Sequence, residues 1–356
     1  MDISEFQKLK KNLRNLSDLG KFPYHRGTLF TILSQKKVDS VKRKYPKIAE
    51  RLDELADYWK SNKKMPLWLN LTPIMRVRLL LKALGFSKSE IAKSLNDPEY
   101  VEDERLKEAI WRAIYVDYVY SPLAVKHQFA RGKLGEEIIR RWLESRGVDH
   151  KDERDMRKES EKTPDFFLPV PIEIKGKEIN WIESKALFGD PRTHSFYSKK
   201  QYSQYLELFG EGVVVYWFGH VRDLDNNVMD GTFFSSPLRN ALLDMRIYTM
   251  GIDKHSLDKL EKLIQNLAVS TVVDLRYDND LEIEHAEYVR IPELEERENF
   301  GEHMRTKEFV EGMSKLIDLY SKGRMLLICK ERNWKKCHRR HISWVLRNLG
   351  FDVVHI

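Results

Sequence analysis

The sequence has 356 residues, of which 42% are hydrophobic and 33% are charged, so it can build packed cores and still present a well-solvated surface. This length predicts two or three domains at roughly 100–200 residues each. No apolar run reaches the roughly 18 residues of a membrane span, the N-terminal segment lacks a secretory apolar core, and two cysteines give no disulfide framework. These features exclude membrane-spanning and disulfide-rich secreted proteins, and we expect an intracellular, cytoplasmic protein.

Basic residues are concentrated at the start of the chain. Residues 1–65 contain 16 Lys and Arg against 8 Asp and Glu, whereas the whole chain has a net charge of +7. A concentrated basic patch is expected of a protein that binds a polyanion. The alternative interpretation is a lysine-rich, solvated helical surface.

Residues 1–125 are predicted to be helical. Residues 27–59 contain two short apolar-periodic segments, with a break near Ser34 and an end at Pro46. A proline removes a helical hydrogen bond, so it favours a helix end.

The segment 72–96 predicts a clearer pair of helices. The first ends at Gly85, and the second begins at Ser87 with Glu90 in capping-box spacing. A helix, a glycine-containing turn and a second helix that begins at serine resemble the helix-turn-helix modules of DNA-binding proteins.

After Pro122 the pattern changes to an α/β unit. The order of helix, hairpin, helix and strand predicts an α/β sandwich. The predicted elements are a helix at 132–147, a hairpin at 163–186, a helix at 198–210, a buried strand at 212–219 and a loop at 222–231.

From about residue 245, strands and helices alternate, which predicts a second α/β unit with a mainly parallel sheet and helices on both faces. The predicted strands are 246–252, 270–277, 324–331 and 352–356, and the predicted helices are 255–268, 304–323 and 337–350.

The hairpin carries three charged side chains in segments otherwise suited to a sheet core. Glu183 and Lys185 share one face of their strand because they are two residues apart. Counting back from the turn at Gly176 places Asp165 opposite them, with slippage allowed at two prolines. Two adjacent carboxylates repel each other unless a cation lies between them, and Mg²⁺ takes oxygen ligands.

These three residues therefore predict a catalytic metal site, in which Lys185 polarises the attacking water or stabilises charge on a phosphate. The alternative is an exposed hairpin with a Glu–Lys pair.

The segments Pro164-Asp165 and Glu183–Lys185, joined by a strand, a turn and a strand, resemble the motif of the PD-(D/E)xK nuclease superfamily. "GEE", "TPDF", "WIESKA.FGD" and "VVVYWFG", with helix-turn-helix sequence ahead of them, resemble the archaeal TPD family and its eukaryotic relative, the codanin-interacting nuclease family, over roughly residues 1–235. The resemblance implies a restriction-endonuclease-like α/β/α core that cuts phosphodiesters with Mg²⁺ or Mn²⁺ held by Asp165 and Glu183. A nuclease fold that has lost activity is a further alternative, but all three charged residues are present.

Such folds often draw another acidic ligand from the first core helix. Glu136 lies by helical spacing on the flank of the buried face, whereas Glu137 shares the wet face with arginines, so Glu136 is the predicted ligand. Gln201 and Tyr205 match the Q-x-x-x-Y-like residues that some relatives place beside the metal, and His194 is a predicted phosphate contact.

The C-terminal segments "IYTMG", "VDLR", "YVRIPEL", "MRTKEF", "ICKE" and "CHR" resemble the domain of unknown function 488 over residues 246–356. The chain departs from that family at 251–253, where the family usually has Gly-His-Ser.

Ligands collect at the carboxyl ends of parallel strands, and a helix N-terminus favours anions and thiolates. We therefore expect a site for a small anionic or nucleotide ligand formed by Asp274, Arg276, Cys337, His338 and Arg339. The alternative is that Cys337 packs as a small apolar residue and Arg339 pairs with Glu331. Zinc ligand types are also present, but Cys337 and His338 are adjacent and Cys329 lies on a predicted strand, which is poor zinc-ligand spacing.

The predicted organisation is multidomain, α and α/β. It comprises a helical, helix-turn-helix-like DNA-binding region (1–125), a nuclease domain (126–240) and a C-terminal α/β domain (245–356). The predicted function is a Mg²⁺- or Mn²⁺-dependent DNA endonuclease in DNA repair or recombination, and a homodimer is one assembly we expect, because many related nucleases act as dimers. The alternatives are a non-catalytic DNA-binding regulator and a ligand-processing enzyme whose chemistry lies in the C-terminal domain.

Overall fold

The computed structural model describes residues 1–158, 160–224, 227–252, 257–277 and 281–356. The chain forms two compact units, each assembled from two separate stretches of sequence. The first unit comprises residues 1–33 and 131–245, and the second comprises 34–130 and 246–356. Two long helices, α2 (Arg26–Ala49) and α7 (Pro122–Glu144), pass from one unit into the other. The three-part division expected from the sequence stays a prediction.

The first unit contains a five-stranded sheet in the order β1-β2-β3-β4-β5. Its strands are β1 (Lys151–Asp152), β2 (Phe166–Ile174), β3 (Lys177–Lys185), β4 (Gly212–Tyr216) and β5 (Val228–Asp230). The first three strands pair antiparallel, and β3, β4 and β5 pair parallel.

The hairpin β2–β3 confirms the predicted strand–turn–strand. Its turn uses Lys175 and Gly176, both with positive φ (52° and 76°), a conformation that glycine adopts without strain. The register shifts between Phe167 and Ile172, on either side of two prolines, which have no N–H to donate to a neighbouring strand.

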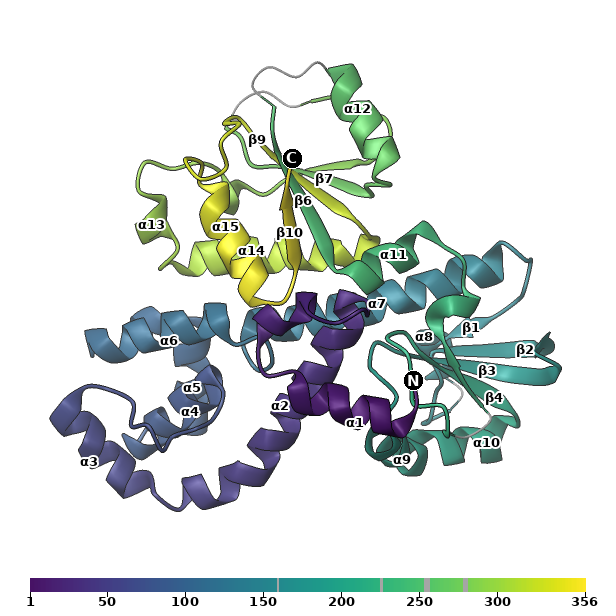
Figure 1. Cartoon of the computed structure of the whole chain (residues 1–356), viewed down its shortest axis with the longest axis horizontal. Coiled ribbons are helices and arrows are strands. Elements are labelled where there is room, and N and C mark those ends of the chain that lie inside the picture. Colours follow the sequence, from purple (N-terminus) through teal and green to yellow (C-terminus); the bar gives the residue numbers. More distant parts are fainter. Residues whose placement is uncertain (159, 225–226, 253–256, 278–280) are drawn as a thin grey trace. The chain divides into compact units, whose positions relative to one another are not determined.

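Helices and turns surround this sheet (Figure 1). Besides parts of α2 and α7, they are α1 (Ile3–Asn12), η1 (Leu16–Gly20), α8 (Glu153–Met156), α9 (Pro191–Tyr197), η3 (Ser198–Tyr202), α10 (Ser203–Phe209), η4 (Gly231–Phe233) and α11 (Pro237–Asp244). The predicted helix 198–210 is thus part of a longer helical segment that contains one π-helical turn, η3. The predicted loop 222–231 is wrong in its last part, because β5 pairs there with β4; residues 225–226 of that loop lie outside the described residues.

Two sequence expectations about the long helices are wrong. Helix α2 runs unbroken through Ser34 and Pro46. Pro46 lies in its last turn, so little of the helix follows the hydrogen bond that the proline removes. Helix α7 begins at Pro122 rather than at residue 132, since proline is well suited to the first position of a helix.

The second unit begins with a group of helices: α3 (Leu52–Asn62), α4 (Pro73–Ala83), α5 (Lys88–Asn96), η2 (Pro98–Tyr100) and α6 (Glu104–Val116). The predicted helix pair is confirmed as α4 and α5. Gly85 follows α4 with φ of 91°, and the Ser87 N–H donates to Glu90 Oε2 (2.8 Å) while the Glu90 N–H donates to Ser87 Oγ (3.3 Å). These reciprocal bonds form the predicted capping box.

The second sheet has the order β10-β6-β9-β7-β8, and all its pairings are parallel, as predicted. Its strands are β6 (Arg246–Gly251), β7 (Thr271–Asp274), β8 (Glu287–Arg290), β9 (Met325–Cys329) and β10 (Asp352–His355). The remaining elements are α12 (Leu257–Asn266), η5 (Pro292–Leu294), α13 (Phe300–His303), α14 (Lys307–Leu319), η6 (Tyr320–Lys322) and α15 (Arg339–Asn348).

Helix α12 lies on one side of this sheet and α15 on the other (Figure 1). Leu260 and Ile264 of α12 pack against Tyr248, Val272 and Ile328 of three neighbouring strands. Residues 255 and 256 of the predicted helix 255–268 lie outside the described residues. Across the described part of the chain, no helix is both long and apolar enough to cross a membrane.

Candidate functional site

The three side chains predicted to be catalytic lie together at one end of the hairpin. Asp165 directly precedes β2, and Glu183 and Lys185 close β3. The Asp165 N–H donates to Glu183 Oε2 (3.2 Å), and the Ser184 N–H donates to Asp165 Oδ2 (2.7 Å). The Lys185 ammonium donates to the Glu183 carboxylate. Two strands and one tight turn therefore bring two carboxylates and one amine close together, and Lys185 is in direct contact with Glu183.

Burial makes these charges interact strongly. The Glu183 side chain is 3% exposed and that of Lys185 is 15% exposed. Burial, followed by the charge of Glu183, raises the pKa of Asp165 to about 8. Burial also raises the pKa of Glu183, despite the opposing effect of Lys185. Burial alone would lower the pKa of Lys185, but the charges of Glu183 and Asp165 outweigh it, so the pKa is raised and the amine keeps its proton.

Helix α7 supplies the additional acidic side chain. Burial, followed by the charge of Asp165, raises the pKa of Glu136 to about 7. Its neighbour Glu137 instead pairs with Arg140 (2.5 Å) and Arg141 (2.6 Å). Glu136 therefore lies within the electrostatic reach of the carboxylate pair, while Glu137 belongs to a surface ion-pair group.

The three carboxylates do not form a closed cluster. Among the residues that the structure describes, one group of three ligand atoms lies within 4.8 Å of one another, and it belongs to Cys329, Cys337 and His338. Glu153, at the start of α8, was missed by the sequence reasoning although its charge raises the pKa of both Glu136 and Asp165. Nothing in its sequence context indicates that it lies near the hairpin.

A buried tryptophan supports the carboxylate pair. The Trp217 Nε1–H donates to Ser184 Oγ (2.8 Å), and the Ser184 backbone in turn donates to Asp165. Trp217 packs on Gly135 of α7, where a Cβ atom would lie only 2.3 Å from Trp217 Nε1. The glycine next to Glu136 is thus required by a close approach that the sequence did not reveal.

The helical segment after β3 holds the predicted substrate contacts. The Tyr205 hydroxyl donates to the Thr163 carbonyl (2.8 Å), and His194 Nδ1 lies 3.1 Å from the Tyr216 hydroxyl. Gln201 Oε1 is buried and has no hydrogen-bond partner within the described residues. The substrate roles of Gln201, Tyr205 and His194 stay predictions. Tyr197, which sequence reasoning missed, lies with its ring centroid 5.0 Å from Lys185 Nζ.

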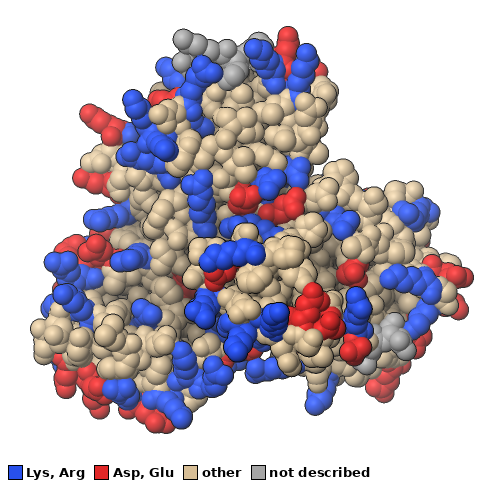
Figure 2. Space-filling view, in the orientation of Figure 1, with Lys and Arg blue, Asp and Glu red and all other residues tan. Residues whose placement is uncertain are grey.

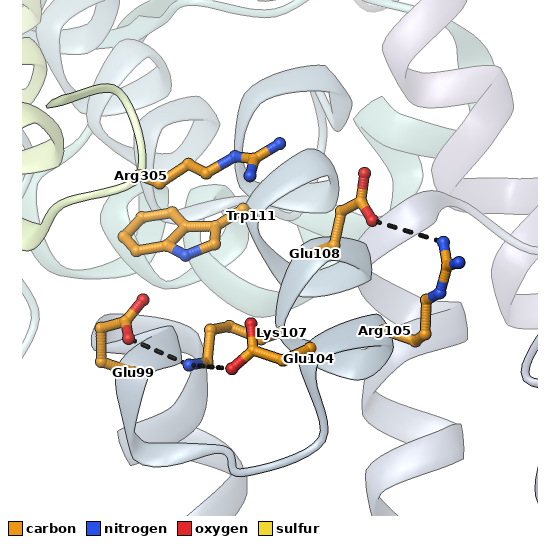
Figure 3. Close-up of a pocket in the computed structure, with 7 residues that line it drawn as sticks. All are labelled: Glu99, Glu104, Arg105, Lys107, Glu108, Trp111 and Arg305. Atoms are coloured by element: carbon orange, nitrogen blue, oxygen red, sulfur yellow. Dashed lines mark hydrogen bonds and ion pairs between the residues drawn. The ribbon is translucent and has the colours of Figure 1, made fainter. Parts of the chain in front are cut away.

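A pocket on α6 has a different character (Figure 3). It is lined by Glu99, Glu104, Arg105, Lys107, Glu108, Trp111 and Arg305. Lys107 pairs with Glu99 (3.0 Å) and Glu104 (2.9 Å), and Arg105 lies 4.0 Å from Glu108. Because its acidic and basic groups largely pair with one another, this pocket offers neither a cation site nor a phosphate site.

The predicted C-terminal site lies at the carboxyl ends of strands. Asp274 is fully buried and accepts hydrogen bonds from Arg276 Nη2 (2.7 Å) and the Tyr288 hydroxyl (2.7 Å).

At the start of α15, contact with the Cys329 thiol lowers the pKa of Cys337 to about 3. The thiolate character expected of Cys337 stays a prediction. Arg339 is 1% exposed and donates to the Glu331 carbonyl, and the anion site stays a prediction.

Comparisons with known proteins agree with both sequence resemblances. A family model described as "Protein of unknown function TPD sequence-motif" matches residues 102–236, and one described as "Domain of unknown function DUF488" matches residues 239–346. The chain is 32% identical over 240 residues to CDAN1-interacting nuclease 1 of Homo sapiens, which covers 61% of this chain and 84% of the human protein. The chain belongs to the CDAN1-interacting nuclease 1 family.

Other members of the CDAN1-interacting nuclease 1 family give similar matches. The protein of Xenopus laevis is 29% identical over 278 residues, which covers 71% of this chain and 90% of that protein. The protein of Danio rerio is 35% identical over 165 residues, which covers 44% of this chain and 55% of that protein. No solved structure matches the chain. The TPD match includes the whole hairpin and Glu136.

Proposed function

We propose that the protein is a Mg²⁺- or Mn²⁺-dependent DNA endonuclease that acts in DNA repair or recombination. The observation that carries this proposal is the buried contact between Asp165, Glu183 and Lys185. Its relatives are named nucleases. The order of the first sheet, an antiparallel hairpin that continues through a parallel strand, supports a restriction-endonuclease-like core.

The donor atoms fit a hard divalent cation. Asp165 and Glu183 provide adjacent carboxylates whose pKa values are raised by burial, and a cation between them would relieve their repulsion. Such a cation supplies Lewis-acid polarisation of a phosphate and lowers the pKa of water. Glu136, which feels the charge of Asp165, is the third residue that would face it.

Lys185 has the properties of a charge stabiliser. Its pKa is raised by two carboxylates, so it carries a proton throughout the neutral range. Its ammonium group can donate to the attacking water or to the phosphate oxygens on which negative charge builds. The contact with Glu183 fixes the amine beside the carboxylate pair, where the scissile phosphate would bind.

Helix α2 and the α4–α5 pair are the proposed DNA-binding elements. Most basic residues of the chain's first segment lie in the helices α1, α2 and α3, and α2 is anchored by the buried side chains of Leu29, Phe30 and Leu33. Lys42, Arg43 and Lys47 of α2 are exposed. Figure 2 shows basic side chains interspersed with acidic ones over the visible face of the molecule. Lysine and arginine bind DNA largely through its phosphates.

The proposal is tested with purified full-length protein and fluorescently labelled duplex, nicked, branched and single-stranded DNA, and with RNA, in the presence of Mg²⁺, Mn²⁺ or EDTA. Asp165→Asn and Glu183→Gln should each lower the cleavage rate at least about a hundredfold. Lys185→Met should slow cleavage while the protein still binds the metal.

Glu136, the proposed metal ligand on α7, has a matched control in its neighbour Glu137. Glu136→Gln should weaken cleavage and metal binding, whereas Glu137→Gln removes only surface ion pairs of small energetic value and should leave both unchanged. Wild-type protein that binds DNA but cuts none of the substrates with either metal would favour the non-catalytic regulator. Equal losses in the two glutamate variants would contradict the role of Glu136.

A further inference from the structure

Three ligand-type side chains converge at the end of the central strand of the second sheet. The sulfur atoms of Cys329 and Cys337 lie 3.2 Å apart, and His338 Nδ1 lies 3.8 Å from each of them. A carboxylate oxygen of Glu331 lies 3.8 Å from Cys329 Sγ. The expectation that these residues are poorly spaced for zinc is wrong, because the loop between β9 and α15 folds back and closes the gap that the sequence suggests.

The imidazole of His338 is buried without a strong hydrogen-bond partner among the described residues. The residue is 6% exposed, and its Nε2 atom has no hydrogen-bond partner within the described residues. Among the described residues, its Nδ1 atom has hydrogen-bond contacts to the two sulfurs, which are weak hydrogen-bonding groups. A buried polar ring is costly to leave without strong partners. A metal ion at Nδ1 would replace these weak contacts by one strong bond to the ring.

The separations of three atoms, the two sulfurs and His338 Nδ1, are close to those between three corners of a coordination tetrahedron. With zinc–sulfur bonds of about 2.3 Å and zinc–nitrogen bonds of about 2.0 Å, tetrahedral geometry places two sulfurs about 3.8 Å apart and a sulfur and a nitrogen about 3.5 Å apart. The observed separations are 3.2 Å and 3.8 Å. We propose that Cys329, Cys337 and His338 bind one Zn²⁺ ion, and that the Glu331 carboxylate, which lies beside Cys329, turns toward the ion as the fourth ligand.

Charge balance supports this ligand set. Two thiolates, one carboxylate and a divalent cation sum to a single negative charge, and a neutral imidazole leaves it unchanged. The guanidinium of Arg339 supplies the opposite charge, because its Nε lies 3.3 Å from Cys337 Sγ. The Arg339 backbone N–H also points to this sulfur (3.5 Å). Hydrogen bonds from surrounding groups orient metal ligands and tune their charge in this way.

The loop that carries Glu331 is held close to β6. The Ile252 N–H donates to the Cys329 carbonyl (2.9 Å), and a Cβ atom at Gly251 would lie 2.1 Å from the Glu331 carbonyl oxygen. Glycine at this position lets the loop approach the strand end, so Glu331 stays close to Cys329. This site is independent of the proposed nuclease site, which offers oxygen ligands in the other unit.

The test uses full-length protein, purified under reducing conditions and stripped of metal. Titration with Co²⁺ should produce the intense near-ultraviolet charge-transfer absorption of cobalt–thiolate bonds, which a carboxylate site cannot give. Saturation is expected at about one ion per chain, and added Zn²⁺ should bleach the absorption. Elemental analysis of the untreated protein should find about one zinc per chain.

Cys337→Ser and His338→Ala should weaken Co²⁺ binding at least about tenfold, and Glu331→Gln should weaken it less. His341→Ala is the matched control, because His341 lies one turn into α15 and outside the cluster; it should bind like wild type. Circular dichroism checks that each variant folds. The proposal is overturned if wild-type protein gives no thiolate absorption, or if its two cysteines are found joined in a disulfide with no affinity for the metal. It is also overturned if His341→Ala loses binding as completely as Cys337→Ser.

Discussion

A methyl group added at Gly135 gives the sharpest test of how the carboxylate pair is supported. In Gly135→Ala, the new Cβ atom would lie 2.3 Å from Trp217 Nε1 and 2.8 Å from Cδ1, so the indole must move by about an ångström to reach ordinary contact near 3.4 Å. The indole has no room to move, because Trp217 is 1% exposed and also packs closely on Gly231.

The destabilisation expected for Gly135→Ala has two linked causes, overpacking of the core and loss of the Trp217 hydrogen bond. Overpacking of a core costs about 1–3 kcal/mol, and a displaced indole leaves its N–H without Ser184 at a cost of about 1–3 kcal/mol. One movement causes both losses, and alanine is favoured over glycine in a helix by about 0.5–1 kcal/mol. The expected destabilisation is therefore about 2–3 kcal/mol, or a fall in melting temperature of roughly 5–10 °C.

Thermal unfolding followed by circular dichroism measures the loss of stability. The rate of cleavage of labelled DNA shows whether moving Trp217 also disturbs Asp165, which Trp217 supports through Ser184. The matched control is Gly132→Ala, one turn earlier on α7, where the Cβ atom would meet only Glu136 Oε1 at 4.0 Å. It should gain about 0.5–1 kcal/mol from helix propensity. In Gly135→Ala/Trp217→Phe, the smaller ring should recover part of the loss. If Gly135→Ala has the same melting temperature as the wild-type protein, the close packing of Trp217 on Gly135 does not support the carboxylate pair.

Three further predictions concern pH, salt and loop packing. Because the pKa values of Asp165 and Glu136 are raised to about 8 and about 7, a cation must displace protons from them. Mg²⁺ affinity measured by calorimetry should therefore rise about tenfold or more per pH unit from pH 6 to 7. Glu136→Gln should make this rise with pH less steep. A wild-type affinity that does not change with pH would contradict the prediction. Replacing exposed Lys42, Arg43 and Lys47 by glutamine should lower the log–log salt slope of duplex binding by about 0.9 for each lost phosphate contact, and an unchanged slope would mean that α2 is only a solvated surface. Gly251→Ala places a methyl group against the backbone of the Glu331 loop, so it should reduce the zinc content of the full-length protein, whereas Gly301→Ala, with open space around it, should not.

The hairpin was predictable because its geometry is local. Strand periodicity and a tight turn fix which residues face each other, so Asp165 and Glu183 could be placed together by counting. The positions of Glu153 and Trp217 were not predictable, because they depend on how separate elements pack. The sequence did not predict the cysteine cluster for the same reason. Cys329 and Cys337 are eight residues apart, and their sulfurs meet because of the fold of the intervening loop.

Helix ends were predicted less well than helix pairs. The capping box at Ser87 is a local signal and is found in the structure. Pro46 and Pro122 are local signals too, but their effect depends on position within a helix, and the sequence alone does not show that position. Strand β8 was missed because it is short and its residues are at most half-buried, so it lacks a strong apolar pattern.

The interleaved order of the two units constrains how the protein is made. The first unit needs residues 131–245 before it can close around residues 1–33, and the second needs residues up to 356 to cover helices that leave the ribosome much earlier. Helix α6 packs through Tyr115 on Phe309 of α14 and Trp344 of α15, so this face of α6 must wait for helices that are synthesised near the end of the chain. A fragment that ends near residue 236 or begins near residue 239, between the two family matches, would separate residues 34–130 from residues 246–356 of the same unit. We expect such fragments to aggregate when they are expressed alone.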